Sequence, residues 1–202
     1  DSILWSFPGG SPDFSNDLIP GAVMYSDTGI YKIYFSYVTE CGMAEDSIDF
    51  EVLALPDLAV SDNAPLCEGE TLELATNASV NFTFTWSGPN GFMSDEPNPE
   101  IPNIELNEAG DYSVTITDGN DCSNIAVTNV TVFELPKIEI DADQSSFCEG
   151  DSVVLTASGG EVYEWSPSAT LNNDTGGQVV GMPTETTIYS VLGTDMNGCK
   201  NS

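Results

Sequence analysis

The sequence predicts an all-β protein made of tandem antiparallel β-sandwich modules arranged end to end. Three observations predict this class: a repeat of about 80 residues, alternation of apolar and polar residues, and clusters of turn residues between the alternating segments. No segment carries apolar residues at a sustained helical period. Short strands joined by frequent turns are typical of two-sheet sandwiches.

The repeat is defined by three kinds of anchor residue. The string Cys67-Glu-Gly-Glu returns 81 residues later as Cys148-Glu-Gly-Asp, and each copy is followed by an alternating segment and then a tryptophan. Each tryptophan precedes a tyrosine that stands ten residues before a cysteine: Trp5–Tyr31–Cys41, Trp86–Tyr112–Cys122 and Trp165–Tyr189–Cys199. Because independent anchors keep their register, we interpret the chain as three copies of one unit.

The module boundaries are predicted from two Leu-Pro dipeptides. Leu55-Pro56 and Leu135-Pro136 lie 80 residues apart, each after an alternating segment. Proline cannot donate a ladder hydrogen bond, so each dipeptide indicates the end of a last strand. We therefore define module 1 as residues 1–55, module 2 as 56–135 and module 3 as 136–202. By the register of the anchors, module 1 lacks its first strands and module 3 its last, which is expected to leave Cys41 unpaired by truncation.

The repeated aromatic residues are predicted to lie in the module cores. The string from Glu108 to Val114 resembles the turn into strand F of an immunoglobulin domain, with its tyrosine corner, and 27–31 repeats it. Residues 184–189 are a variant of this turn without the glycine. The residues expected in the cores are Trp5, Trp86, Trp165, Tyr31, Tyr112 and Tyr189.

Four cysteines are predicted to form two disulfides, one in each of modules 2 and 3. Both cysteines of a module are expected at the same end of its sandwich, which pairs Cys67 with Cys122 and Cys148 with Cys199. Each bridge would close a loop of about 55 residues, worth roughly 4 kcal/mol in the chain-entropy model. Disulfides imply an oxidising, extracytoplasmic location.

Composition excludes several classes of function. Three basic residues stand against 33 acidic ones, a formal net charge of -30, so the chain repels nucleic acid and anionic lipid. The absence of histidine removes the usual general base and histidine-ligated metals. Paired carboxylates remain as a catalytic option, but no pair stands out from the repeat. No apolar run is long enough to span a membrane, and the sequence predicts a protein that is not an enzyme.

Acidic residues near the predicted module boundaries are candidate calcium ligands, since carboxylates and carbonyls can share an ion there. They are Asp57, Asp62, Asp141 and Asp143. No known calcium-loop signature is present, so the favoured interpretation is a solvated acidic surface without a cofactor.

Several strings resemble one family of repeats. Cys-Glu-Gly-(Glu/Asp), Tyr163-Glu-Trp165-Ser and Gly198-Cys199 resemble the Ig-like and PKD-like repeats of large Bacteroidota surface proteins exported by the type IX secretion system. The segment 5–12 is similar to a PKD repeat, although Pro8-Gly-Gly stands where Gly-Asp-Gly is usual. The resemblance covers all 202 residues and includes SprB-like gliding-motility adhesins.

The resemblance implies a secreted stalk attached to the outer membrane. Such a stalk acts in surface attachment or gliding motility, contacts extracellular surfaces or polysaccharides through avidity, and is anchored through regions outside these residues. Similar repeats are spacers or carbohydrate-binding modules of secreted hydrolases, and this alternative stays open. Asp-(Ser/Thr)-apolar triplets are O-glycosylation signals in this phylum, which makes Ser2, Ser47 and Ser152 candidate sites.

Overall fold

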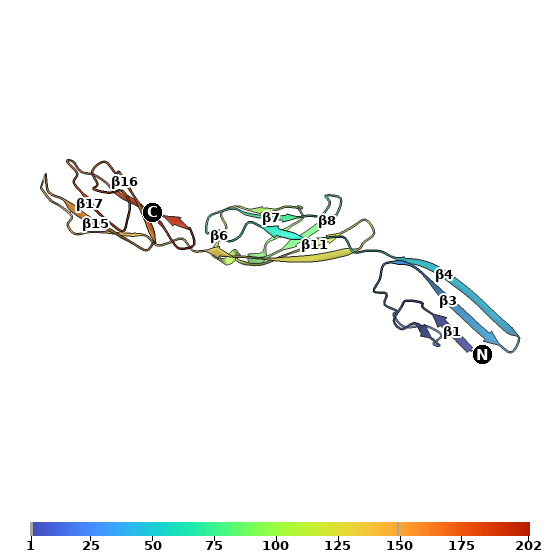
Figure 1. The fold of residues 1–202 in the computed structure, drawn as a ribbon. Helices are drawn as coiled ribbons and strands as arrows, with labels where there is room; N and C mark the ends of the chain where they lie inside the picture. Colours follow the sequence, from blue (N-terminus) through green and yellow to red (C-terminus); the bar gives the residue numbers. More distant parts are fainter. Residues whose placement is uncertain (1, 149) are drawn as a thin grey trace. The chain divides into compact units, whose positions relative to one another are not determined.

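The computed structural model describes residues 2–148 and 150–202, and nearly all of its regular structure is β (Figure 1). The chain divides into two compact units, Asp1–Asp57 with Ile116–Asn124, and Leu58–Thr115 with Ile125–Ser202. Strand pairs join residues within module 1, within module 2 or within module 3. The predicted all-β antiparallel class is therefore confirmed, while the boundaries near 55 and 135 stay a prediction.

Module 1 forms a four-stranded sheet of order β2-β1-β3-β4 in its described residues. Its strands are β1 (Ser2–Ser6), β2 (Phe14–Ser15), β3 (Gly29–Thr39) and β4 (Gly42–Val52). The long hairpin β3–β4 pairs without interruption from Gly29↔Val52 to Thr39↔Gly42. Trp5 of β1 lies opposite Phe35 of β3, with ring centroids 4.6 Å apart, so aromatic side chains share one face of this sheet.

Module 2 is a two-sheet sandwich. One sheet has the order β10-β7-β5 and the other β12-β11-β8-β9, while β6 runs parallel to β13. The strands are β5 (Val60–Asp62), β6 (Leu66–Cys67), β7 (Leu72–Thr76), β8 (Thr83–Ser87), β9 (Met93–Ser94), β10 (Glu100–Ile101), β11 (Gly110–Thr117), β12 (Ser123–Val130) and β13 (Val132–Phe133). Two 3-10 turns, Pro89–Gly91 and Leu106–Glu108, connect them. This order matches the immunoglobulin sandwich, in which strands A, B and E face strands C, F and G.

Module 3 repeats this order with fewer strands. Its sheets are β14-β15-β17 and β16-β18-β19. The strands are β14 (Glu139–Ala142), β15 (Val153–Ser158), β16 (Val162–Ser166), β17 (Gln178–Gly181), β18 (Ser190–Thr194) and β19 (Lys200–Asn201). Residues of both sheets form one core: Val153, Leu155, Ala157, Tyr163, Trp165, Val179 and Val191.

The tryptophans of modules 2 and 3 lie at the centre of their sandwiches. Trp86 and Trp165 are buried, and each indole N–H donates to a backbone carbonyl, of Glu96 and Gly176 respectively. Trp5 is half-buried, and its indole N–H has no partner among the described residues. The tryptophan at the same repeat position is therefore less buried in module 1 than in modules 2 and 3.

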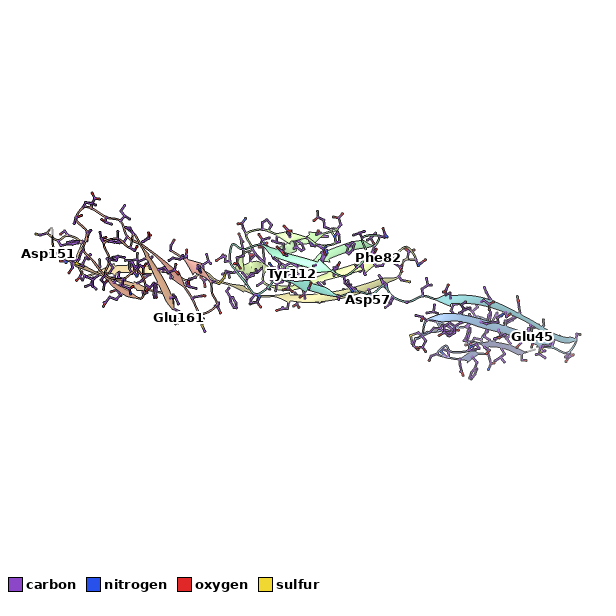
Figure 2. All side chains as sticks on the ribbon, turned by 45° about the horizontal axis from the view of Figure 1, so that its top comes forward. Glu45, Asp57, Phe82, Tyr112, Asp151 and Glu161 are labelled. Carbon is purple, nitrogen blue, oxygen red and sulfur yellow. A yellow bond between two sulfur atoms is a disulfide. The ribbon has the colours of Figure 1, made fainter. Side chains whose placement is uncertain are left out.

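Two of the three repeated tyrosines form a tyrosine corner. The hydroxyl of Tyr112 donates to the carbonyl of Glu108 at 2.8 Å, and that of Tyr31 to the carbonyl of Asp27 at 2.9 Å. Figure 2 shows Tyr112 inside module 2, where burial, and secondarily the charge of Glu108, raise its pKa from 10.0 to about 12. Tyr189 is half-buried and its hydroxyl pairs with that of Thr170, so the variant string in module 3 forms no corner.

Candidate functional site: the junction cysteines

Cys41, Cys122 and Cys199 lie in the turn between strands F and G of their modules, and we call them turn cysteines. Around Cys122 and Cys199 this turn is built in the same way. The carboxylate of Asp118 accepts from the N–H of Cys122 at 3.0 Å, and that of Asp195 from the N–H of Cys199 at 2.8 Å. Aspartate favours such a turn because its short side chain can accept a hydrogen bond from a backbone N–H a few residues ahead. In module 1 the N–H of Cys41 donates to the hydroxyl of Thr39 instead of to an aspartate.

Cys67 and Cys148 begin a different loop, and we call them loop cysteines. The N–H of Cys67 donates to the Glu70 carboxylate at 2.8 Å, and that of Cys148 to the Asp151 carboxylate at 3.3 Å. The third residue of each loop, Gly69 or Gly150, has a φ of +89° or +94°. Glycine adopts this left-handed conformation without steric cost, which explains its place in both strings.

The disulfide in the described residues joins Cys67 to Cys199, with Cα atoms 5.6 Å apart. It connects a loop cysteine of module 2 to the turn cysteine of module 3. Cys41, Cys122 and Cys148 are free thiols. The predicted pairs Cys67–Cys122 and Cys148–Cys199 are therefore wrong, and the bridge joins consecutive modules.

The pairing within modules was wrong because loop and turn lie at opposite ends of a sandwich. In module 2, β12 begins directly after Cys122 and leads into β13, whose Phe133 lies beside Cys67. Eight residues of extended strand span about 26 Å, whereas bridged Cα atoms lie about 4.4–6.8 Å apart. In module 3, Asp151 belongs to the loop, and the N–H of Glu161 donates to the carbonyl of Thr194, just before the turn that contains Cys199. Asp151 and Glu161 lie at opposite ends of the module (Figure 2).

A repeated hydrogen bond accompanies the turn cysteines. The side-chain amide of Asn201 donates to the carbonyl of Pro136 at 3.0 Å, and that of Asn124 to the carbonyl of Pro56 at 3.0 Å. Both asparagines follow the turn cysteine by two residues, and both prolines belong to the Leu-Pro dipeptides. Sequence reasoning missed these residues, although Asp-x-x-x-Cys-x-Asn occurs twice at equivalent places and was a usable signal.

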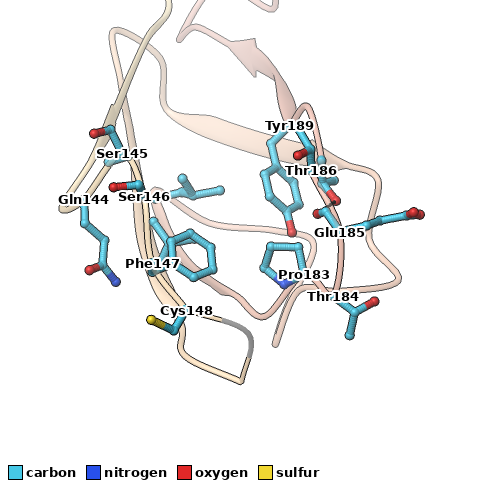
Figure 3. Close-up of a pocket in the computed structure, with 14 residues that line it drawn as sticks. Gln144, Ser145, Ser146, Phe147, Cys148, Pro183, Thr184, Glu185, Thr186 and Tyr189 are labelled. Atoms are coloured by element: carbon cyan, nitrogen blue, oxygen red, sulfur yellow. Dashed lines mark hydrogen bonds between the residues drawn. The ribbon is translucent and has the colours of Figure 1, made fainter.

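A hollow of ≈ 530 Å³ lies beside the free loop cysteine of module 3 (Figure 3). Phe147 lines one side of it and Pro183 and Tyr189 the other, with Cys148 at its edge. At the equivalent place in module 2, Leu66 and Cys67 pair with β13.

Two of the four candidate calcium ligands accept hydrogen bonds from residues of their own module. Asp62 accepts from the N–H of Ala64 and the hydroxyl of Thr128, and Asp143 accepts from the N–H of Val154. Residues 2–148 and 150–202 contain no group of three or more side chains suited to hold a metal ion. The carboxylates of Asp62 and Asp143 thus have structural partners inside modules 2 and 3 respectively.

Two further features concern the surface. The candidate glycosylation residues Ser2, Ser47 and Ser152 are exposed, as a modified residue must be.

At the start of module 3, Lys137 and Glu139 form an ion pair at 2.6 Å, and the hydrogen bond from Lys137 lowers the pKa of Glu139. The described chain has no helix long and apolar enough to cross a membrane.

Comparison with known proteins gives distant structural likenesses. No protein-family model matches the chain, and no curated protein matches its sequence. Among solved structures, the amphioxus IgVJ-C2 molecule is 15% identical, with a TM-score of 0.34 over 65% of this chain and 89% of that one. Murine CEACAM1b is 13% identical, with a TM-score of 0.37 over 69% and 93%. The insect immune protein hemolin is 14% identical, with a TM-score of 0.39 over 85% and 54%.

Proposed function

We propose that this chain is a structural and adhesive stalk region of a large secreted bacterial cell-surface protein that acts in surface attachment or gliding motility. The observation that carries this proposal is the bond between Cys67 and Cys199, which ties two consecutive sandwiches together covalently. A chain that transmits force between a cell and a surface benefits from such a bond, because the two modules cannot be pulled apart until it is reduced.

The second support is the nature of the junction itself. Asn201 holds the Pro136 carbonyl while the disulfide holds the loop, so two constraints act on one short connection. Proline also fixes its own φ angle and stiffens the connection. These constraints favour a spacer that keeps its reach over a flexible tether.

The surface chemistry supports extracellular partners of low charge or with bound cations. A net charge of -30 disfavours nucleic acid and anionic membranes and favours solubility outside the cell. Surfaces and polysaccharides would be contacted weakly by each module, and many modules in series would add up through avidity. Exposed Ser2, Ser47 and Ser152 are proposed sites of O-glycosylation on this stalk.

The proposal is tested with an antibody against this chain on intact cells, on sheared material and in culture medium. A very large cell-bound species that shear releases as filaments is the expected result. A soluble species of ordinary enzyme size in the medium would contradict the stalk and would indicate spacer modules beside a catalytic domain.

A further inference from the structure

The cysteines fall into two kinds that have matching surroundings in modules 2 and 3. Cys148 and bonded Cys67 each donate to the acidic residue three positions ahead, and Cys122 and bonded Cys199 each donate to an aspartate four positions back. Cys122 and Cys148 are nevertheless free thiols. Cys148 therefore has the surroundings of Cys67, and Cys122 has those of Cys199, but neither has a cysteine bonded to it.

The direction of the existing bridge is fixed by the fold. Cys67 lies beside β13, the strand that leads out of module 2 toward Pro136. Cys199 lies two residues before Asn201, which holds the Pro136 carbonyl from the side of module 3. The bond therefore runs from the exit of one module to the entrance of the next. A loop cysteine faces forward along the chain, and a turn cysteine faces backward.

We propose that Cys148 is one half of an intermodular disulfide whose other half is the turn cysteine of a following module of this same repeat type. Cys122 is the reciprocal half, for the loop cysteine of a preceding module. In this arrangement each module is bonded to both neighbours, and the stalk carries a continuous series of covalent links between modules. The inference concerns assembly of the repeat and does not depend on which surface the stalk binds.

A second observation at Cys148 supports a missing neighbour. The hollow beside it is lined by the half-buried rings of Phe147 and Tyr189 together with Val153 and Leu155 of the core. In module 2 the equivalent loop is paired with β13, through Leu66↔Val132 and Cys67↔Phe133. A continuing strand and the module after it would fill the hollow and bring a turn cysteine to Cys148.

Bonding inside module 3 is excluded by distance. The loop of Cys148 precedes β15, and the far end of that strand pairs Ser158 with Glu139, close to Pro136 and hence to Asn201. Six residues of strand span about 20 Å, several times the separation of bridged Cα atoms. Cys148 and Cys199 cannot meet without unfolding this sheet.

Formation of the bond requires a disulfide oxidant, such as an oxidised dithiol protein or oxidised glutathione. The Cys148 thiolate attacks one sulfur of the oxidant and releases its other sulfur as a thiol, which leaves a mixed disulfide. The thiolate of the turn cysteine then attacks the Cys148 sulfur and releases the second oxidant thiol. Two protein thiols lose two electrons and two protons, and the oxidant disulfide is reduced to two thiols.

The experiment extends the full chain in register. Asn124 and Asn201 are equivalent, so residues 1–201 followed by a second copy of 125–202 complete module 3 and add one module. The extended chain is refolded in a glutathione redox buffer, free thiols are blocked, and disulfide-linked peptides are identified by mass spectrometry without reduction. The unextended chain and the Cys148→Ser variant of the extended chain are the controls.

The expected result is a Cys67–Cys199 bond in every chain and a new bond between Cys148 and the appended copy of Cys199. The Cys148→Ser control should keep the first bond and leave the appended Cys199 as a free thiol. A Cys148–Cys199 bond within module 3, or a Cys148 thiol that stays free in a folded extended chain, would overturn the proposal. Folding is checked separately by the Cys67–Cys199 bond and by circular dichroism.

Discussion

Module 1 and module 2 carry the same strand pattern and reach different degrees of burial. In module 2, Tyr112, Val114 and Ile116 on β11 are fully buried. The equivalent residues of β3, Tyr31, Ile33 and Phe35, also share one face of their strand, and all three are only half-buried. Ile48, which lies opposite Ile33, is 64% exposed.

The difference comes from the second sheet. In module 2 the sheet β10-β7-β5 packs Leu72 and Leu74 over the face that Trp86 and Tyr112 share, whereas the described residues of module 1 supply one sheet. Alternation thus marks which face is apolar, and only a packed second layer removes that face from water.

The largest expected effect is on the covalent link, which module 2 has and module 1 lacks. Cys67→Ser should lower the free energy of unfolding by about 5 kcal/mol in the chain-entropy model for a loop of this length, whereas Cys41→Ser, at a free exposed thiol, should change it little. Guanidinium unfolding followed by circular dichroism measures both. Reduced wild-type protein should match Cys67→Ser, and equal shifts for both variants would contradict the assignment.

The next effect tests burial directly. Trp86→Ala should destabilise module 2 by about 3–5 kcal/mol, because it leaves a cavity in a closed core. Trp5→Ala should cost module 1 only about 1 kcal/mol, since a half-buried ring loses less contact with apolar surface. Hydrogen exchange of β11 and β3 reports each module separately. A Trp5→Ala effect as large as that of Trp86→Ala would show that module 1 has a closed core.

Alkaline pH should reveal the buried tyrosine. The pKa of Tyr112 is raised to about 12 in the folded protein, from the usual 10.0, chiefly by burial. The folded state therefore holds this proton more tightly, so the associated stability is complete below pH 10 and is lost as pH rises toward 12. Spectrophotometric titration should show a phenol that titrates near pH 12 and that Tyr112→Phe removes. A titration curve unchanged by that substitution would contradict the shift.

The smallest expected effect separates the two tyrosine corners. Tyr112→Phe removes a hydrogen bond to the Glu108 carbonyl in a closed core and should cost about 1–1.5 kcal/mol. Tyr31→Phe removes the matching bond to Asp27 at a solvent-exposed site and should cost about 0.5 kcal/mol. Thermal unfolding of the two single variants is the measurement. The reverse order would mean that exposure does not set the strength of this bond.

Particular elements show how far sequence reasoning reached. The face of β11 and the corner at Tyr112 could be predicted because alternation and the Gly-Asp-Tyr string are local. Local spacing also misled: Tyr189 has the right register but bonds Thr170, since residues 184–188 do not form the same turn. The sequence did not show that Gly88 and Gly9 lie against the ring of the corner tyrosine, where a Cβ would be 2.5 Å and 2.7 Å from that ring.

The sequence by itself determined the repeat, the strand pattern, the acidic surface and the two kinds of cysteine. These properties depend on residues close together in the chain or on composition, which the tertiary structure cannot change. Only the tertiary structure decided which cysteines meet. Register shows that Cys67 resembles Cys148 and that Cys122 resembles Cys199, but pairing depends on which ends of the sandwiches adjoin. Because strands carry the chain from one end of a module to the other, the nearest partner of Cys67 lies in the next module.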